Sequence, residues 1–258
     1  MKMISFYNKK VGVVGKKTLC KNVAYKFALE NKKFLIIDLN PQATITFELK
    51  GTEVNLEKTI SDCFVFNKNN SLKKVIQNTK YKEIDYIVGR EKVKKVNFLL
   101  KKLYENNDKF FVAENIYLTN KETLDSYDYV LIDYPPTVDE LSLNWLIISD
   151  LIIIPINEGL GAFKGILDLI NTLKYICKRE KRKIPEYKII LNTIKSDKNL
   201  ILINEWLDEK GFLNYCFKII LKSSETFLTN ENELASNWDS KYYWRQKQAY
   251  EELIKEIK

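Results

Sequence analysis

The sequence predicts a doubly wound α/β fold: a mainly parallel sheet with helices on both faces, formed by one domain over residues 1–258. Two observations lead to this prediction. Several short runs are apolar throughout, as expected for strands that are buried on both faces of a parallel sheet. Segments with the spacing of amphipathic helices alternate with these runs along the chain. A chain of 258 residues is long enough to fill such a sheet alone.

The apolar runs define the expected strands. In chain order they are 3–7, 34–38, 84–88, 129–133, 151–154, 187–191 and 216–221. Helical spacing of apolar residues defines the expected helices, which are 18–31, 163–177, 200–210 and 246–257. Gly211 follows the third of these helices, in the position where glycine often ends a helix.

Composition excludes several classes of enzyme. The chain has no histidine, so serine hydrolases with the usual triad and most zinc enzymes are ruled out. The four cysteines are scattered and form no C-x-x-C pair, which leaves no redox or zinc motif. They are Cys20, Cys63, Cys177 and Cys216.

Charge and hydropathy indicate the compartment and the kind of partner. The formal net charge is +8, which favours polyanions such as nucleic acid. The N-terminal decapeptide is too short and too polar for a secretory signal. The longest apolar run, 146–156, is broken by Ser149, Asp150 and Pro155 and falls short of the ~20 residues that a membrane span needs. We expect a cytoplasmic protein without a transmembrane segment.

Three polar segments follow expected strands directly: 8–18, 38–42 and 133–137. Ligands of open parallel sheets bind at the carboxyl ends of the strands. The first segment reads NKKVGVVGKKT and lies between a strand and a helix. A glycine-rich turn there can direct backbone N–H groups and a helix N-terminus at a phosphate. Taken alone, it fits a phosphate loop or a purely structural turn.

The other segments carry a family resemblance. FLIIDLNPQAT, YDYVLIDYPPT, SDLIIIPINEGLGAFKGI and the C-terminal AYEELIKEIK occur in the order and spacing of the ParA/MinD partition ATPases. The chain resembles this family over nearly its whole length. The resemblance implies a P-loop NTPase fold, ATP and Mg²⁺ as cofactors, and a nucleotide-bound homodimer.

The resemblance also implies roles for single residues. Lys16 matches the P-loop lysine that reaches the β- and γ-phosphates, and Gly12 and Gly15 match glycines of the same loop. Thr18 matches the second threonine of the motif. Lys10 resembles the signature lysine that crosses the dimer interface to the partner's nucleotide.

The resemblance also implies roles for residues at the ends of expected strands. Asp38 and Asp133 match the acids near Mg²⁺, and Asn192 matches a position that contacts adenine in related proteins. Lys10, Asp38 and Asn40 are the candidate catalytic residues under this resemblance.

Several positions depart from the family pattern. Lys17 occupies the place of the Ser or Thr that ligates Mg²⁺, and Asn40 replaces an acid that positions the attacking water. The stretch between Lys10 and Lys16 is one residue longer than in the family, with valine at 11 or 13 where glycine is expected. Ammonium groups have no lone pair for a metal, and amides carry no charge. We expect weak nucleotide binding, slow hydrolysis, or none.

The resemblance to ParA implies non-specific DNA and a ParB-like centromere-binding protein as partners. The candidate DNA contacts are Lys195, Lys198, Lys222, Lys241, Arg245 and Lys247. Two alternatives remain: a pseudo-ATPase that is an accessory or structural dimer, and a membrane-positioning protein like MinD. An aromatic cluster near the C-terminus fits core or partner packing better than base stacking; it comprises Trp238, Tyr242, Tyr243 and Trp244.

Overall fold

The strands of the chain belong to one sheet. The computed structural model describes residues 1–9, 14–50, 54–64, 71–103, 112–135, 137, 139–224 and 238–258. The strands are β1 (Lys2–Phe6), β2 (Phe34–Asp38), β3 (Ile76–Asn78), β4 (Ile84–Ile87), β5 (Tyr129–Asp133), β6 (Leu151–Ile156), β7 (Glu186–Ile194) and β8 (Cys216–Lys222). Within the described residues these eight strands pair in the order β3-β4-β2-β5-β1-β6-β7-β8.

Helices connect the strands. The longer ones are α1 (Lys16–Ala28), α4 (Lys92–Leu103), α8 (Leu160–Arg179), α9 (Asp197–Glu209) and α12 (Trp244–Ile257). The shorter ones are α2 (Thr44–Leu49), α3 (Ser61–Phe64), α5 (Val112–Thr119), α6 (Lys121–Asp125) and α7 (Glu140–Leu146). Single 3₁₀ turns are η1 (Leu72–Lys74), η2 (Leu213–Tyr215) and η3 (Lys241–Tyr243).

The sheet is mainly parallel, and the predicted fold class is confirmed. All neighbouring pairs of strands among the described residues run parallel except β3 and β4. The antiparallel strand β3 lies at the edge of the sheet next to β4. Because the two strands run in opposite directions, a short turn can join them and no crossover connection is needed. The strand order places β1 at the centre between β5 and β6, so the segment after β1 leaves the middle of the sheet.

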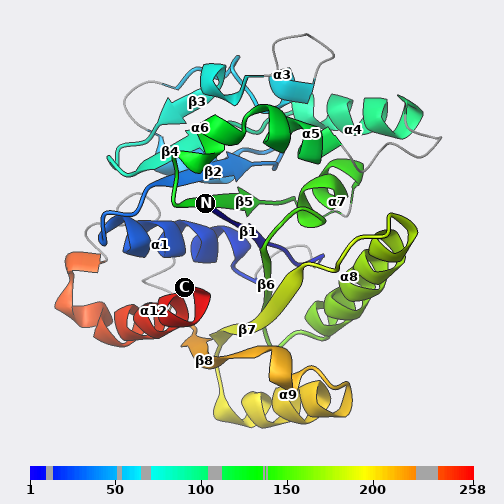
Figure 1. Cartoon of the computed structure of the whole chain (residues 1–258). Coiled ribbons are helices and arrows are strands. Elements are labelled where there is room, and N and C mark those ends of the chain that lie inside the picture. Colours follow the sequence, from blue (N-terminus) through cyan, green and yellow to red (C-terminus); the bar gives the residue numbers. More distant parts are fainter. Residues whose placement is uncertain are drawn as a thin grey trace.

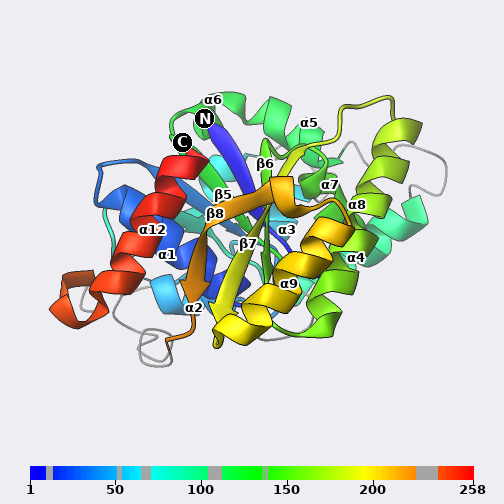
Figure 2. The same cartoon turned by 90° about the horizontal axis from the view of Figure 1, so that it is seen from below.

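Alternate side chains of the strands pack into two separate hydrophobic cores, one on each face of the sheet. Leu35 and Ile37 of β2 pack with α4, α5, α7, α8 and α9 on one face. Ile36 of the same strand packs with α1, α2 and α12 on the other. The two views show the resulting three layers, with α1 and α12 on one side of the sheet and α8 on the other (Figures 1 and 2). This double burial explains why the strand sequences are apolar without a break.

Each expected strand exists, with shifts of one to three residues at some ends. The helix expected at 18–31 begins at Lys16 and ends at Ala28, because Asn31 adopts a positive φ of 58° that no helix accommodates. Gly211, with φ 71°, ends α9 as expected. Strand β3 and helices α2, α3, α5, α6 and α7 were not predicted because they are short. Helix α4, with 12 residues, was also not predicted.

The C-terminal aromatic cluster divides into two buried and two exposed rings. Trp238 and Tyr243 are 5% and 8% exposed and pack against α1 and α12, while Tyr242 and Trp244 are 79% and 56% exposed. The expectation of a packing role is thus met by the first two rings. In the described parts of the chain, no helix has the length and apolarity that a bilayer crossing requires.

Candidate functional site

Two buried carboxylates meet at the carboxyl edge of the sheet. Asp38 at the end of β2 stands directly opposite Asp133 at the end of β5. Their exposed fractions are 0% and 2%. Burial raises the pKa of Asp38 to about 6, and burial with the neighbouring Asp38 charge raises the pKa of Asp133 to about 8. The prediction that these two acids lie side by side is confirmed.

Asp38 is fixed by the turn and helix that follow it. The backbone N–H of Asn40 donates to Asp38 Oδ1 at 2.9 Å, and the Thr46 hydroxyl donates to Oδ2 at 2.8 Å. Asn40 closes the turn itself, since its side-chain oxygen accepts from the N–H of Gln42 at 3.0 Å. Gly89 lies against this turn, and a Cβ there would be 2.5 Å from the Asn40 carbonyl oxygen.

The start of α1 brings a lysine close to Asp133. Gly15 precedes the helix with φ 72°, a conformation that glycine adopts without cost. Lys16 opens the helix and donates from Nζ to the Asn8 carbonyl oxygen at 2.8 Å. Burial lowers the pKa of Lys16 to about 8, and the negative charge of Asp133 opposes that effect.

Asn192 at the end of β7 fixes the same loop from the other side. Its Nδ2 donates to the Val14 carbonyl oxygen at 2.8 Å. A Cβ added to Gly15 would lie 2.4 Å from that nitrogen. Asn192 thus sets the position of the glycine-rich loop in addition to any contact with a ligand.

A cavity of about 610 Å³ opens over Asp133 and the start of α1; we call it the first cavity. Its walls come from the α1 start, the 40–42 turn, α4 and the segment after β5. The lining residues are Gly15, Lys16, Lys17, Thr18, Asn40, Pro41, Gln42, Glu91, Lys94, Asn97, Asp133, Tyr134, Pro135, Thr137 and Asp139.

A second cavity of about 600 Å³ lies between the ends of β7 and β8 and the first turns of α12. Its walls combine apolar and aromatic groups with polar ones, as small-molecule sites do. Thr18 lines both cavities, so they adjoin at the start of α1. Its other lining residues include Asn192, Thr193, Ile219, Leu221, Lys222, Trp244, Arg245, Gln248 and Tyr250.

Three charged side chains join α1 to α2 beside the first cavity. Lys17 pairs with Glu48 Oε1, and Lys21 pairs with Glu48 Oε2 at 2.6 Å. The exposed side-chain fractions are 30% for Lys17, 10% for Glu48 and 5% for Lys21. Glu48 therefore separates two lysines that would otherwise repel one another on successive turns of α1.

Strained backbone gathers at the same edge of the sheet. Ala43, Arg90 and Thr193 have φ values of 50°, 142° and 56° without being glycine. Ala43 and Arg90 lie in the loops after β2 and β4, and Thr193 is near the C-terminal end of β7, where it lines the second cavity. Such conformations persist where the surrounding structure holds them, and they are frequent at ligand sites.

The residues at the site do not match the magnesium site that the family resemblance implies. Mg²⁺ takes oxygen ligands, but Lys17 presents an ammonium where the family has a hydroxyl. Both oxygens of Asp38 already accept hydrogen bonds. In the described part of the chain, no three His, Cys, Asp or Glu side chains come together to hold a metal ion. A role of Asp38 and Asp133 beside Mg²⁺ stays a prediction.

The structure brings most predicted site residues together. Lys16, Lys17, Thr18, Asn40 and Asp133 line the first cavity, whereas Lys10 and Gly12 lie outside the described residues. Among the candidate DNA contacts, Lys222 and Arg245 line the second cavity.

Sequence reasoning did not find every residue of the site. Gly89 carried a usable signal, because it is a glycine directly after an expected strand. Thr46, Glu48, Lys94, Asn97 and Asp139 had none, because they reach the site from helices, or from the residue just before one, at positions that only the tertiary structure sets.

Comparison with known proteins gives consistent matches. Residues 1–186 match the AAA domain family model AAA_31. The chain is 26% identical over 199 residues to the sporulation initiation inhibitor protein Soj of Bacillus subtilis, covering 77% of this chain and 75% of Soj.

Two solved structures have the same fold. Apo McdA from Cyanothece superposes with a TM-score of 0.78 at 19% identity, covering 99% of this chain and 98% of that one. A plasmid partition protein from Borrelia burgdorferi, bound to AMPPNP, superposes with a TM-score of 0.73 at 22% identity, over 99% and 98%.

Replacement of Gly15 by alanine tests the loop geometry. We expect Gly15→Ala to lower the free energy of unfolding by about 3 kcal/mol, because the methyl group meets Asn192 and the φ is unfavourable for alanine. Gly211→Ala is the matched control: its φ is 71°, but nothing lies within 4 Å of the added Cβ. Its expected loss is about 1 kcal/mol. Urea unfolding measures the free energy of unfolding of both variants. An equal loss in the two variants would contradict the contact with Asn192.

Removal of one buried carboxylate should change how stability depends on pH. The folded-state pKa of Asp133 is about 8 and its ordinary value is 3.8. Between these values the folded chain binds more protons than the unfolded chain, so stability falls as the pH rises. We expect Asp133→Asn to raise the free energy of unfolding at pH 8, on the order of 2 kcal/mol, and to flatten this slope.

Denaturant unfolding from pH 5 to pH 9 measures the effect of Asp133→Asn. The control is Asp125→Asn, which neutralises an exposed carboxylate on α6. If Asp133→Asn left the dependence of unfolding free energy on pH unchanged, or if the control changed it equally, the raised pKa of Asp133 would be contradicted.

Proposed function

The chain belongs to the ParA/Soj family of P-loop ATPases, and we propose that it binds ATP, pairs with a second copy around the nucleotide and binds DNA without sequence preference, with impaired hydrolysis. The observation that carries this proposal is the position of Lys16. It opens α1 beside Asp133, the register partner of Asp38, and lines the first cavity, which adjoins the second cavity at Thr18.

In the proposed complex the nucleotide spans the two cavities. The phosphates lie in the first cavity, where Lys16, Lys17 and the N–H groups at the start of α1 supply positive charge. The base lies in the second cavity against Trp244 and the apolar residues of β8. Thr18, which lines both cavities, then lies beside the part of the nucleotide that joins them.

Impaired hydrolysis follows from two side chains at the phosphate end. Asn40 offers no negative charge to orient an attacking water, and its amide oxygen is already bonded to the N–H of Gln42. Lys17 replaces a hydroxyl and pairs with Glu48. A second candidate function rests on the same two residues: a pseudo-ATPase that uses nucleotide only to hold a dimer.

A MinD-like attachment to membranes gains no support from α12. Its apolar residues Tyr250, Leu253, Ile254 and Ile257 are at most 5% exposed and pack against the rest of the chain. An amphipathic anchor must instead offer its apolar face to the lipid. The ParB-like centromere-binding partner and a cytoplasmic, DNA-associated location remain parts of the proposal that rest on the family resemblance.

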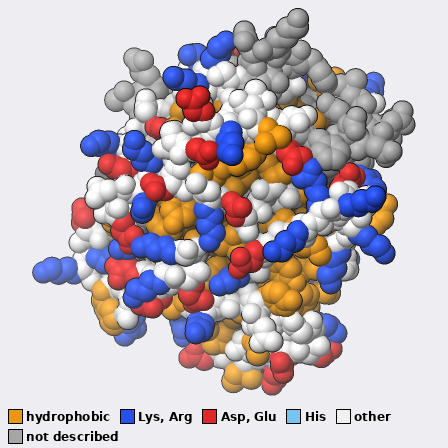
Figure 3. Space-filling model, in the orientation of Figure 1, with side chains coloured by type: hydrophobic (Ala, Val, Ile, Leu, Met, Phe, Trp, Pro, Cys, Tyr) orange, Lys and Arg blue, Asp and Glu red, His pale blue; other side chains and the backbone are white. Residues whose placement is uncertain are grey.

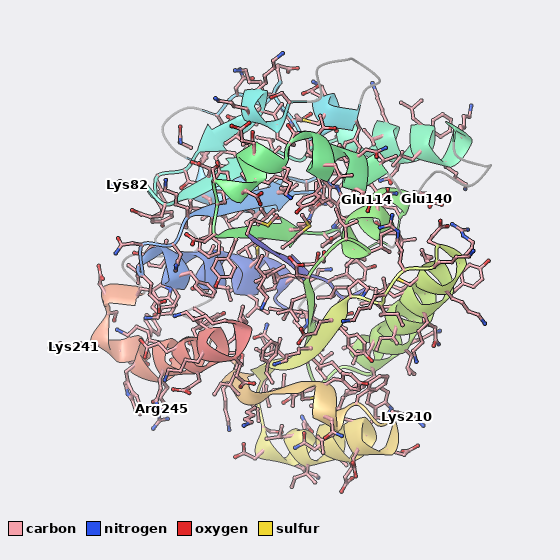
Figure 4. All side chains as sticks on the ribbon, in the orientation of Figure 1. Lys82, Glu114, Glu140, Lys210, Lys241 and Arg245 are labelled. Atoms are coloured by element: carbon pink, nitrogen blue, oxygen red, sulfur yellow. The ribbon has the colours of Figure 1, made fainter. Side chains whose placement is uncertain are left out.

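The proposed DNA surface follows the carboxyl ends of β7 and β8 and the first turns of α9 and α12, which lie along one edge of the molecule (Figure 2). Most of the basic candidates there are exposed. In contrast, the face seen in Figure 3 mixes acidic and basic side chains without a field of one sign. Lys241 and Arg245 lie together at the start of α12, far from Lys210 (Figure 4).

Restoring the family residues should raise turnover. We expect the double variant Lys17→Thr, Asn40→Asp to release phosphate about tenfold faster than the natural chain, a change of ~1.4 kcal/mol in the barrier. Threonine supplies a metal ligand, and aspartate keeps the turn bond to Gln42 while adding charge. Steady-state phosphate release with DNA and Mg²⁺ measures it, with each single variant alongside. A natural chain that already matches the double variant would contradict impaired hydrolysis.

Loss of two basic side chains should weaken DNA binding in a salt-dependent way. We expect Lys198→Ala, Lys241→Ala, two exposed candidates outside both cavities, to reduce affinity for any duplex and to make the plot of log affinity against log salt shallower by about two. The control is Lys210→Ala, an exposed lysine at the far end of α9 that pairs with Glu209. Fluorescence anisotropy with two unrelated duplexes measures both, and no binding at low salt with ATP would refute the DNA role.

A further inference from the structure

Lys17 is the member of the Lys17–Glu48–Lys21 cluster that reaches the first cavity. Lys21 is 95% buried in its side chain, with its ammonium on Glu48 Oε2 at 2.6 Å. Lys17 lines the cavity wall next to Lys16 and keeps 30% of its side chain exposed. Two ammonium groups share one carboxylate, so the cluster retains a net positive charge beside the cavity.

The position of Lys17 determines which groups lie near the positive charge of the cluster. It is the second residue of α1, a helix of 13 residues whose free N–H groups open toward the same cavity. Its ammonium is also close enough to Asp133 to favour the ionised form of that carboxyl group. Lys17 and Asp133 thus line the same cavity, in which the outer phosphates are proposed to lie.

An ammonium at this place has two consequences. It cannot ligate a metal, and its charge repels a divalent cation placed beside it. It also offers donors of its own: an ammonium has three N–H groups, and the bond to Glu48 uses one. The remaining two can reach phosphate oxygens, as lysine does in many phosphate sites.

We propose that the Lys17 ammonium takes the place of Mg²⁺ at the outer phosphates, so that this chain binds nucleoside triphosphate without a divalent cation. Glu48 positions the ammonium at the cavity wall by holding it and Lys21 apart. The inference rests on the proposed function, because it concerns how the same nucleotide is bound.

The test compares the affinity for a fluorescent ATP analogue in EDTA and in excess Mg²⁺. The natural chain is expected to have the same Kd in both buffers, within about threefold. Lys17→Thr is expected to lose about tenfold or more in EDTA and to recover with Mg²⁺, because the hydroxyl then supplies the metal ligand. Lys17→Arg keeps the charge and is expected to bind equally in both buffers.

Lys26→Thr is the matched control on the same helix, where Lys26 pairs with Glu251 of α12. It is expected to leave both Kd values unchanged, and circular dichroism checks that every variant is folded. Binding of the natural chain only with Mg²⁺, or a Lys17→Thr variant that binds equally in both buffers, overturns the inference and leaves the proposed function standing. No binding in either buffer overturns both.

Discussion

The pairing of β2 with β5 places two carboxylates side by side in a buried position, and the rest of the site depends on this constraint. Asp38 and Asp133 are exact register partners, and neither reaches bulk water. Like charges so close and so buried are unfavourable unless other groups offset them. Lys16 at the start of α1 and the hydroxyl of Thr46 from α2 supply that compensation.

This arrangement explains why several loops are strained and tightly packed. The turn after Asp38 must bring Thr46 back to the carboxylate, and Ala43 adopts a left-handed backbone within it. The loop before α1 must pass beneath Asn192, which leaves no space for a side chain at Gly15. The left-handed backbone and the close contacts at this edge of the sheet lower the stability of the fold but hold the loops in one geometry, as is common where a protein binds a ligand.

Much of this could be predicted from the sequence. The strands are apolar because both their faces are buried, so their positions could be identified directly, and their order follows the family resemblance. The acids at the ends of β2 and β5 were recognisable because each directly follows an apolar run. The glycine at 15 was recognisable because it lies between a strand and a helix.

The remaining features depend on tertiary contacts that leave no local pattern. Glu48 lies in a helix of only six residues, too short for a periodic signal, yet it decides where Lys17 and Lys21 lie. Sequence reasoning identified Lys17 as a lost metal ligand; its pairing with Glu48 and its place on the cavity wall became visible only in the structure. The second cavity likewise forms between β8 and α12, segments far from the P-loop in sequence.

The central claim is that ATP lies across the two cavities with its phosphates at Lys16 and Lys17. The most direct measurement is a crystal structure of the chain grown with ATP. The account predicts phosphates between the start of α1 and Asp133, and the base between β8 and α12 beside Trp244. ATP bound elsewhere on the surface, with both cavities empty, would contradict it.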